Sequence, residues 1–194
     1  MFLQKKFILI FMALALVANL SCVSSSVSYN KDLLDRDNIS IAVLPFKDFN
    51  KKESNNSGAL ARNIFETKLF NRGFNVKSIE AITSDLDCYL FENDEYSRDW
   101  IINAGKISGV DYFIFGSVHD YRVFQHSTTF LYIFSWLETT YSVGITARMV
   151  SSETGEAVWT GSLTKKSYTF SDAANEVVDE FIKSMKLKPV VKQK

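Results

Sequence analysis

The apolar positions from residue 39 onward fall first into a strand-like run and then into a helical one. Residues 39–46 are almost continuously aliphatic and end in Pro45-Phe46, which predicts a buried strand that leads into a loop. A helix that stops at Gly73 is predicted next, because four apolar residues recur at helical spacing: Leu60, Ile64, Leu69 and Phe70. The domain is therefore expected to open with a strand, a loop and a helix.

The same pattern is repeated before residue 120. Residues 74–80 alternate as a second strand, and Thr83 or Ser84 can cap a short helix. Another helix, ended by Gly109, is predicted from an inner face formed by Trp100, Ile101, Ala104 and Ile107. A third strand, 110–118, follows directly.

Consecutive strands are predicted after that point, at about 119–134, 139–150 and 156–168. The last two are joined by Ser152-Glu153-Thr154-Gly155, a tight-turn sequence. A C-terminal helix runs from a Ser171 cap to about Met185, with an apolar stripe made by Ala174, Val177, Val178, Phe181 and Ile182. The prediction is an α/β fold, a mixed β-sheet sandwich packed with helices in the order β-α-β-α-β-β-β-β-α.

The N-terminal segment has the pattern of an export signal. Lys5 and Lys6 precede an apolar run of about 12 residues, too short for a spanning helix of about 20, and Ser21-Cys22 follows. This region resembles the signal of bacterial lipoproteins, in which the cysteine is acylated and becomes the new N-terminus. We therefore expect residues 1–21 to be a signal peptide and Cys22 to carry the lipid (palmitate), while simple secretion and an uncleaved anchor remain alternatives. Val23 favours delivery to the outer membrane.

Residues 22–38 are predicted to be the lipidated cysteine and a polar tether. The 16 residues after Cys22 are rich in Ser, Asp and Asn and would reach at most roughly 50 Å if fully stretched. A single α/β domain is expected over 39–188, followed by a basic tail at 189–194.

Charge and cysteine content narrow the function classes. The chain has 22 basic and 22 acidic side chains, and loss of Lys5 and Lys6 with the signal leaves 20 against 22. This balance gives no electrostatic support for a nucleic-acid partner. If Cys22 carries lipid, Cys88 has no partner for an intrachain disulfide, and a free thiol is expected there.

Catalytic signatures are missing from the sequence. It contains no phosphate-binding loop, nucleophile elbow or metal-spaced Cys/His set, so neither an enzymatic activity nor a cofactor is expected. The acidic stretch 85–95 lacks the glycine of a calcium loop and is expected to be a solvated face. His119 and His126 are seven positions apart on a presumed strand, so they should point to opposite faces and not share a metal.

Three stretches resemble one known family: residues 41–46, residues 109–118, and residues 146–159 with their Glu-Thr-Gly turn. In this order they are similar to the curli production assembly/transport (CsgG-type) lipoproteins and related envelope lipoproteins. The resemblance implies a periplasm-facing α/β domain on a lipid anchor, which acts by assembly and binding. In the curli channel each subunit inserts two β-hairpins. Here residues 121–147 have the length for the first, whereas residues 165–170 are far too few for the second.

The run Phe130-Leu131-Tyr132-Ile133-Phe134-Ser135-Trp136-Leu137 has three interpretations. It is a core strand or hairpin, an exposed patch for a partner or oligomer contact, or a hairpin that inserts into a membrane. The core interpretation is favoured because a nearly continuous apolar run, with seven apolar residues among eight, suits a strand covered on both faces. In the second interpretation the contact residues are Phe130, Tyr132, Phe134 and Trp136.

The expected function is that of a membrane-anchored, periplasm-facing lipoprotein that acts in envelope assembly or secretion by binding and oligomerisation. Its partners would be the membrane, through the lipid, and an envelope protein or further copies of itself. One alternative is a CsgG-type outer-membrane secretion channel. A second alternative is a lipoprotein activator of a cell-wall synthase.

Overall fold

The computed structural model describes residues 25–29, 39–48, 56–78, 96–130 and 134–187. The described elements are, in chain order, β1 (Ser25–Tyr29), β2 (Ser40–Val43), β3 (Lys47–Asp48), α2 (Ser57–Asn71), β4 (Asn75–Lys77), α4 (Arg98–Ser108), β5 (Tyr112–Phe130), β6 (Phe134–Ser151), β7 (Ala157–Ser167) and α5 (Phe170–Met185). Seven strands form one open sheet in the order β1-β7-β6-β5-β2-β4, and β3 also pairs with β5. The pairs β2–β4, β2–β5 and β3–β5 are parallel and the others antiparallel. The predicted α/β fold with a mixed sheet and packed helices is confirmed.

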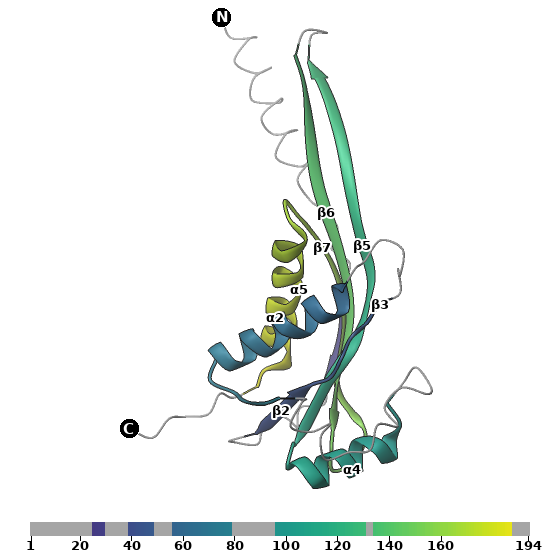
Figure 1. Cartoon of the computed structure of the whole chain (residues 1–194), viewed down its shortest axis with the longest axis vertical. Coiled ribbons are helices and arrows are strands. Elements are labelled where there is room, and N and C mark those ends of the chain that lie inside the picture. Colours follow the sequence, from purple (N-terminus) through teal and green to yellow (C-terminus); the bar gives the residue numbers. More distant parts are fainter. Residues whose placement is uncertain (1–24, 30–38, 49–55, 79–95, 131–133, 188–194) are drawn as a thin grey trace, which may run out of the picture.

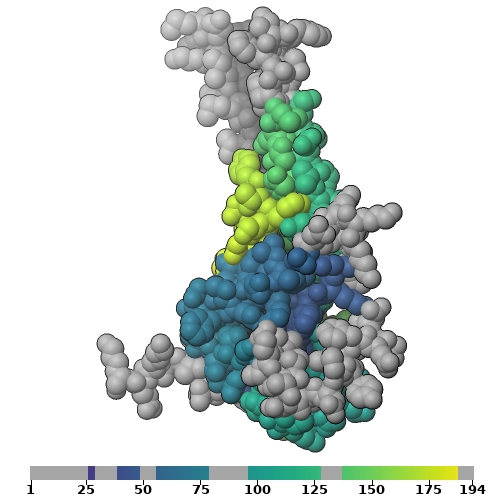
Figure 2. Space-filling model, in the orientation of Figure 1, coloured from purple at the N-terminus to yellow at the C-terminus, as the bar shows by residue number. Residues whose placement is uncertain are grey.

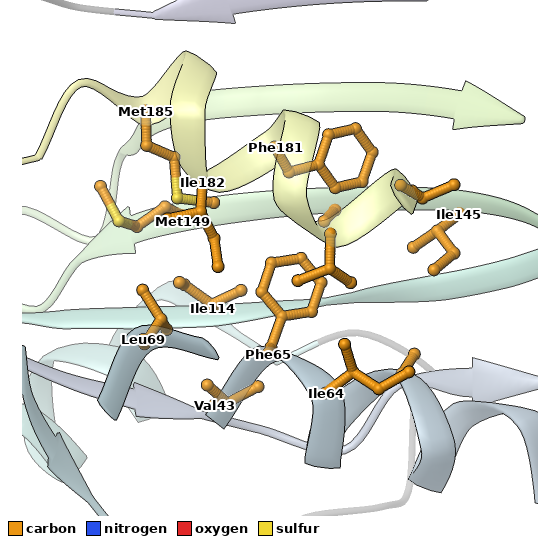
Figure 3. Packing of buried hydrophobic residues seen from close by; sticks show 14 of the residues in the cluster. Val43, Ile64, Phe65, Leu69, Ile114, Ile145, Met149, Phe181, Ile182 and Met185 are labelled. Carbon is orange, nitrogen blue, oxygen red and sulfur yellow. The ribbon is translucent and has the colours of Figure 1, made fainter. Parts of the chain in front are cut away.

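Helices α2 and α5 cover one face of the sheet (Figure 1). Phe65 of α2 and Phe181 of α5 stack on each other, with ring centroids 6.2 Å apart, and Trp159 of β7 meets Phe181 edge to face at 5.2 Å. Figure 3 shows these helices and strands contributing aliphatic side chains to the same core. Each fully buried side chain of this size contributes roughly 1.5–3 kcal/mol relative to exposure, so this layer is the main source of stability.

Helix α4 covers the lower end of the opposite face. Its Ile101 and Ala104 join Phe113 and Phe115 of β5 in a second, smaller cluster. Ser97 caps α4 by accepting a hydrogen bond from the Trp100 backbone N–H at 3.2 Å. Farther along the strands, beyond α4, the same face carries polar residues such as Ser117, Thr146 and Ser162.

Several helix details differ from the predictions. Phe70 was expected to face the core but is 70% exposed, and Ile107 of α4 is also exposed. The buried side of α2 is instead formed by Ala61, Ile64, Phe65 and Leu69. The N-cap of α5 is Thr169 and not Ser171, since its side chain accepts a hydrogen bond from the Asp172 backbone N–H at 3.0 Å. The errors at Phe70 and at the α5 cap arise where two alternatives one or two positions apart satisfy the same pattern.

Two strand predictions also need correction. The strands predicted at 110–118 and 119–134 are one continuous strand, β5, so the expected number of elements after residue 110 was too high by one. Ser25–Tyr29, which lie inside the predicted polar tether, form β1 on the outer edge of β7. Serine-rich segments give little strand signal, and an edge strand that buries little apolar surface cannot be recognised by hydrophobic pattern. The tight turn predicted at 152–155 is confirmed, with Gly155 at φ 68°.

Candidate functional site

Strands β5 and β6 continue as a two-stranded hairpin well beyond the rest of the sheet (Figure 1). Strand β7 pairs with β6 only between Tyr141 and Val150, whereas β5 and β6 remain paired from Val123–Tyr141 to Phe130–Phe134. Seven further residues per strand at about 3.4 Å each give a projection of roughly 24 Å. Figure 2 shows this part, in green, rising as a narrow column from the wider body.

Both edges of the projecting hairpin are open in the part of the chain that the structure describes. On one side β3 pairs with β5 only at Ser117 and Val118, and on the other β7 stops at the level of Tyr141. Open strand edges present rows of backbone donors and acceptors that can pair with another strand. The hairpin is therefore suited to strand addition.

The hairpin is largely polar where its side chains are described. Gln125, His126, Ser127 and Glu138 are exposed, and Leu137 is 63% exposed. The interpretation of residues 130–137 as a strand covered on both faces is therefore wrong for Leu137. The hairpin interpretations, as a contact or as a membrane-inserting element, stay open for this segment.

The predicted contact residues lie at the far end of the hairpin. In the ladder, Phe130 is opposite Phe134 and Trp136 is opposite Thr128, so these four positions share one face. Tyr132 falls outside the described residues, and only the backbone register is defined for the other three. Their role as contacts stays a prediction.

A β-bulge marks the place where the hairpin leaves the body. The register shifts between Val118 and Asp120, so that His119 is the extra residue. Opposite the bulge, a Cβ added to Gly144 would lie 2.7 Å from His119 Nε2 and 2.8 Å from both Asp120 Cβ and Thr164 Oγ1. Only glycine fits that position without displacing a neighbour, and bulges bend and twist a strand locally. Together these residues set the direction of the hairpin.

The bulge contains a buried carboxylate. Asp120 is 8% exposed, accepts a hydrogen bond from Ser142 Oγ at 2.7 Å, and forms an ion pair with the Arg122 guanidinium. Burial tends to raise the pKa of Asp120, but the hydrogen bonds from Arg122 and Ser142 and the charges of Arg122 and His119 outweigh it, so the pKa is lowered. The carboxylate is thus held ionised at the root of the hairpin.

An aromatic cluster fixes the other face of the hairpin base to α5. The Tyr121 ring stacks on Phe170 at a centroid distance of 3.8 Å, and Tyr141 meets Phe170 edge to face at 4.5 Å. Burial and the nearby charge of Asp48 raise the pKa of Tyr121. This cluster could not be predicted from the sequence, because residue 170 lies about 30 to 50 positions from its partners and no local pattern connects them.

Basic side chains lie on both faces of the sheet at this level. In the register Lys165 is opposite Val143, on the α5 face, and Lys166 is opposite Ser142, on the other face. Lys166 Nζ lies 4.7 Å from the centre of the Phe124 ring, and the Arg122 guanidinium is 5.7 Å from it. Cations and aromatic rings therefore surround the hairpin where it emerges.

The two histidines lie differently from the prediction. Because of the bulge, the His119 side chain contacts Thr146, with 3.4 Å between His119 Nδ1 and Thr146 Oγ1. His126 is paired with Glu138, which lies on the same face of β6 as Thr146, so the two histidines share a face. Expecting them on opposite faces was wrong, although they are still seven residues apart along the strand. Within the described residues no group of three or more His, Cys, Asp or Glu side chains is arranged to hold a metal ion.

The remaining candidates of the sequence analysis, Cys22, Cys88 and the acidic stretch 85–95, lie outside the described residues, as do the predicted capping residues Thr83 and Ser84 and the tail 189–194. Among the described helices none has the length and apolarity needed to cross a membrane.

Comparisons with known proteins reveal similarity in structure only. No protein-family model matches the chain, and no curated protein matches its sequence. The fold is similar to that of the PelC dodecamer from Paraburkholderia phytofirmans, with a TM-score of 0.58 and 14% identity over 86% of this chain and 99% of that one. Lipoprotein GNA1162 from Neisseria meningitidis gives a TM-score of 0.48 and 18% identity over 76% and 97% of the two chains. The LpoB C-terminal domain from Escherichia coli gives 0.42 and 15% over 69% and 89%. At 14% identity the likeness to the PelC chain shows a shared fold.

Proposed function

We propose that this chain is a lipid-anchored protein of the bacterial cell envelope, held in the outer membrane and facing the periplasm, which acts in envelope assembly or secretion by binding and oligomerisation. The observation that carries the proposal is the β5–β6 hairpin, which projects roughly 24 Å with open edges and mostly polar described side chains. A hairpin of this kind does not contribute to the core of its own domain. Its length and fixed direction suit a contact with another chain.

Two further points support oligomerisation. The PelC chain that shares this fold is a dodecamer. The bulge at His119, the Asp120 network and the Phe170 cluster hold the hairpin firmly to the body, so the cost of ordering it on binding is low. Identical hairpins on membrane-anchored copies all point the same way, so β6 of one copy and β5 of the next can pair antiparallel in a head-to-tail assembly.

The anchor is tested by replacing Cys22 with Ala. We expect the wild-type protein to be found in the membrane fraction and to carry acyl chains. We expect the variant to carry no acyl chain. Acyl labelling that persists in Cys22→Ala would refute the anchor.

The hairpin is tested by photo-crosslinking in intact membranes. A crosslinking residue at exposed Gln125 should give a ladder of covalent self-oligomers, and the same residue at exposed Lys106, on α4, should not. In a matched variant, residues 124–140 are replaced by Asn-Gly, a two-residue turn that can close the directly opposed Val123–Tyr141 pair. That variant should remain anchored but stay monomeric. Equal crosslinking from both sites would refute a specific role of the hairpin.

A secretion channel is the second candidate, favoured by hairpin length. The projection of roughly 24 Å is close to the apolar band of about 25 Å in membrane β-barrels. Against it, Gln125 and Thr139 form one opposed pair and His126 and Glu138 the next, so both faces of the hairpin are polar at mid-length. If the purified protein conducted ions in planar bilayers and the shortened variant did not, the channel would become the favoured function. Adducts of Gln125 with a cell-wall synthase would favour the activator instead.

A further inference from the structure

The N-terminal end of strand β1 faces the end of the body from which the hairpin projects. It runs antiparallel to β7, with Ser25 opposite Leu163 and Tyr29 opposite Trp159. Strand β7 runs from Ala157, beside the α4 end of the sheet, to Ser167, beside the hairpin base. The chain preceding Ser25 therefore enters the sheet from the hairpin side.

Chain length then limits how far Cys22 can lie from the body. Cys22 precedes Ser25 by three residues, which span at most about 10 Å. Ser25 is level with Leu163, and β7 continues for four residues to Ser167, roughly 14 Å farther. While β1 is paired, Cys22 can rise no higher than the hairpin base. With β1 released, the 17 residues from Cys22 to Ile39 would reach about 60 Å from Ile39. Because Ile39 lies at the α4 end of the sheet, roughly 40 Å below the hairpin base, Cys22 could then rise at most about 20 Å above that base.

We propose that β1 holds the hairpin-side end of the body directly against the lipid surface that anchors Cys22. The inference rests on the proposed acylation of Cys22. In this arrangement β1 sets the distance between domain and membrane, and residues 22–38 do not act as a long tether. The hairpin extends roughly 24 Å past the level that Cys22 can reach, so in this arrangement it enters the lipid layer.

The surface of that end suits head groups of lipids. Lys165 and Lys166 lie on opposite faces of the sheet, so their positive charges flank the hairpin on two sides. Tyr168, directly after β7, is highly exposed beside them. Tyrosine together with Lys or Arg is the combination enriched at membrane interfaces. The acidic groups at this level are Asp48, near Tyr121, Asp172 in the first turn of α5, and Asp120, which is already paired with Arg122.

A small change in sequence should be enough to release β1 from β7. Among the described strands its one neighbour is β7, and its described side chains are exposed, including Val27 at 44%. Backbone hydrogen bonds to β7 are therefore its main attachment. Because the N–H groups of successive strand residues point to opposite sides, prolines at both Val27 and Ser28 must remove at least one bond to β7. Alanines at the same two positions keep both N–H groups and serve as the matched control.

Neutron reflectometry on a supported bilayer measures the separation of body and membrane. The acylated full-length V27P/S28P variant should move its protein layer outward from the head groups by up to about 20 Å relative to the V27A/S28A control. A locked variant, S26C/S162C with Cys88→Ser, joins directly opposed residues through a disulfide and should match the control. If the proline variant shows the same separation as the control, or if the disulfide does not form, the inference is wrong. Failure of wild type to stay on the bilayer would instead refute the anchor.

Discussion

The replacement of Asp120 by Ala tests the energetic importance of the buried network at the hairpin base. Asp120 is 8% exposed and its partner Ser142 is 1% exposed, so the variant leaves the Ser142 hydroxyl buried without its acceptor. Such a group costs about 1–3 kcal/mol. The ion pair with Arg122, a half-exposed side chain, adds only about 0.2–1 kcal/mol. We expect a total loss of about 2–3 kcal/mol in the free energy of unfolding.

Urea denaturation followed by tryptophan fluorescence of the detergent-solubilised chain measures this loss. It corresponds to a decrease in Tm of roughly 5–10 °C for a domain of this size. Asp99→Ala, at an exposed position in the first turn of α4, is the matched carboxylate control and should lose less than about 1 kcal/mol. In the double variant with Ser142→Ala, most of the cost should disappear, because the orphaned hydroxyl is gone. A loss below about 0.5 kcal/mol for Asp120→Ala would refute this explanation of the hairpin base.

Three further predictions concern the same fold. Gly144→Ala places a methyl group within 3 Å of His119 and Asp120 and should destabilise by about 1–3 kcal/mol in the same urea assay; wild-type stability would exclude the close approach. Phe181→Ala empties the centre of the core and should cost about 3–5 kcal/mol by calorimetry, whereas an unchanged Tm would contradict the packing. The pKa of Asp120 is lowered in the folded state, so its contribution to the free energy of unfolding is complete above about pH 5 and is lost as the pH falls below about 4. Asp120→Asn should remove this part of the loss of stability in acid. If the variant and wild type had identical profiles of stability against pH, the lowered pKa would be contradicted.

The sequence was sufficient for the elements whose signals are local. The continuous aliphatic run at 39–46, the glycine stops at Gly73 and Gly109, and the turn at 152–155 each depend on neighbouring residues, and the structure confirms the elements that they define. The apolar stripe of α5 was also predicted correctly, because its buried residues recur at helical spacing. These features specified the α/β class.

The parts that were not predicted depend on contacts between distant residues. The bulge at His119 shifts by one residue the alternation of side chains between the two faces of β5, and this is why the two histidines share a face. No residue type in the sequence predicts the bulge. The apolar run at residues 130–137 suggested a core strand. Leu137 is nevertheless exposed, because β5 and β6 extend beyond every other strand paired with them in the described part of the chain. The assignment of Ser25–Tyr29 to a tether failed for the converse reason, since a polar sequence can still form an edge strand through its backbone.

Light scattering and particle images of the acylated, detergent-extracted chain give its mass and so test oligomerisation through the hairpin. We expect an assembly of several copies for wild type and a single copy for the chain with residues 124–140 replaced by Asn-Gly. A wild-type chain that is monomeric at every concentration, with the same mass as the shortened variant, would contradict oligomerisation through the hairpin.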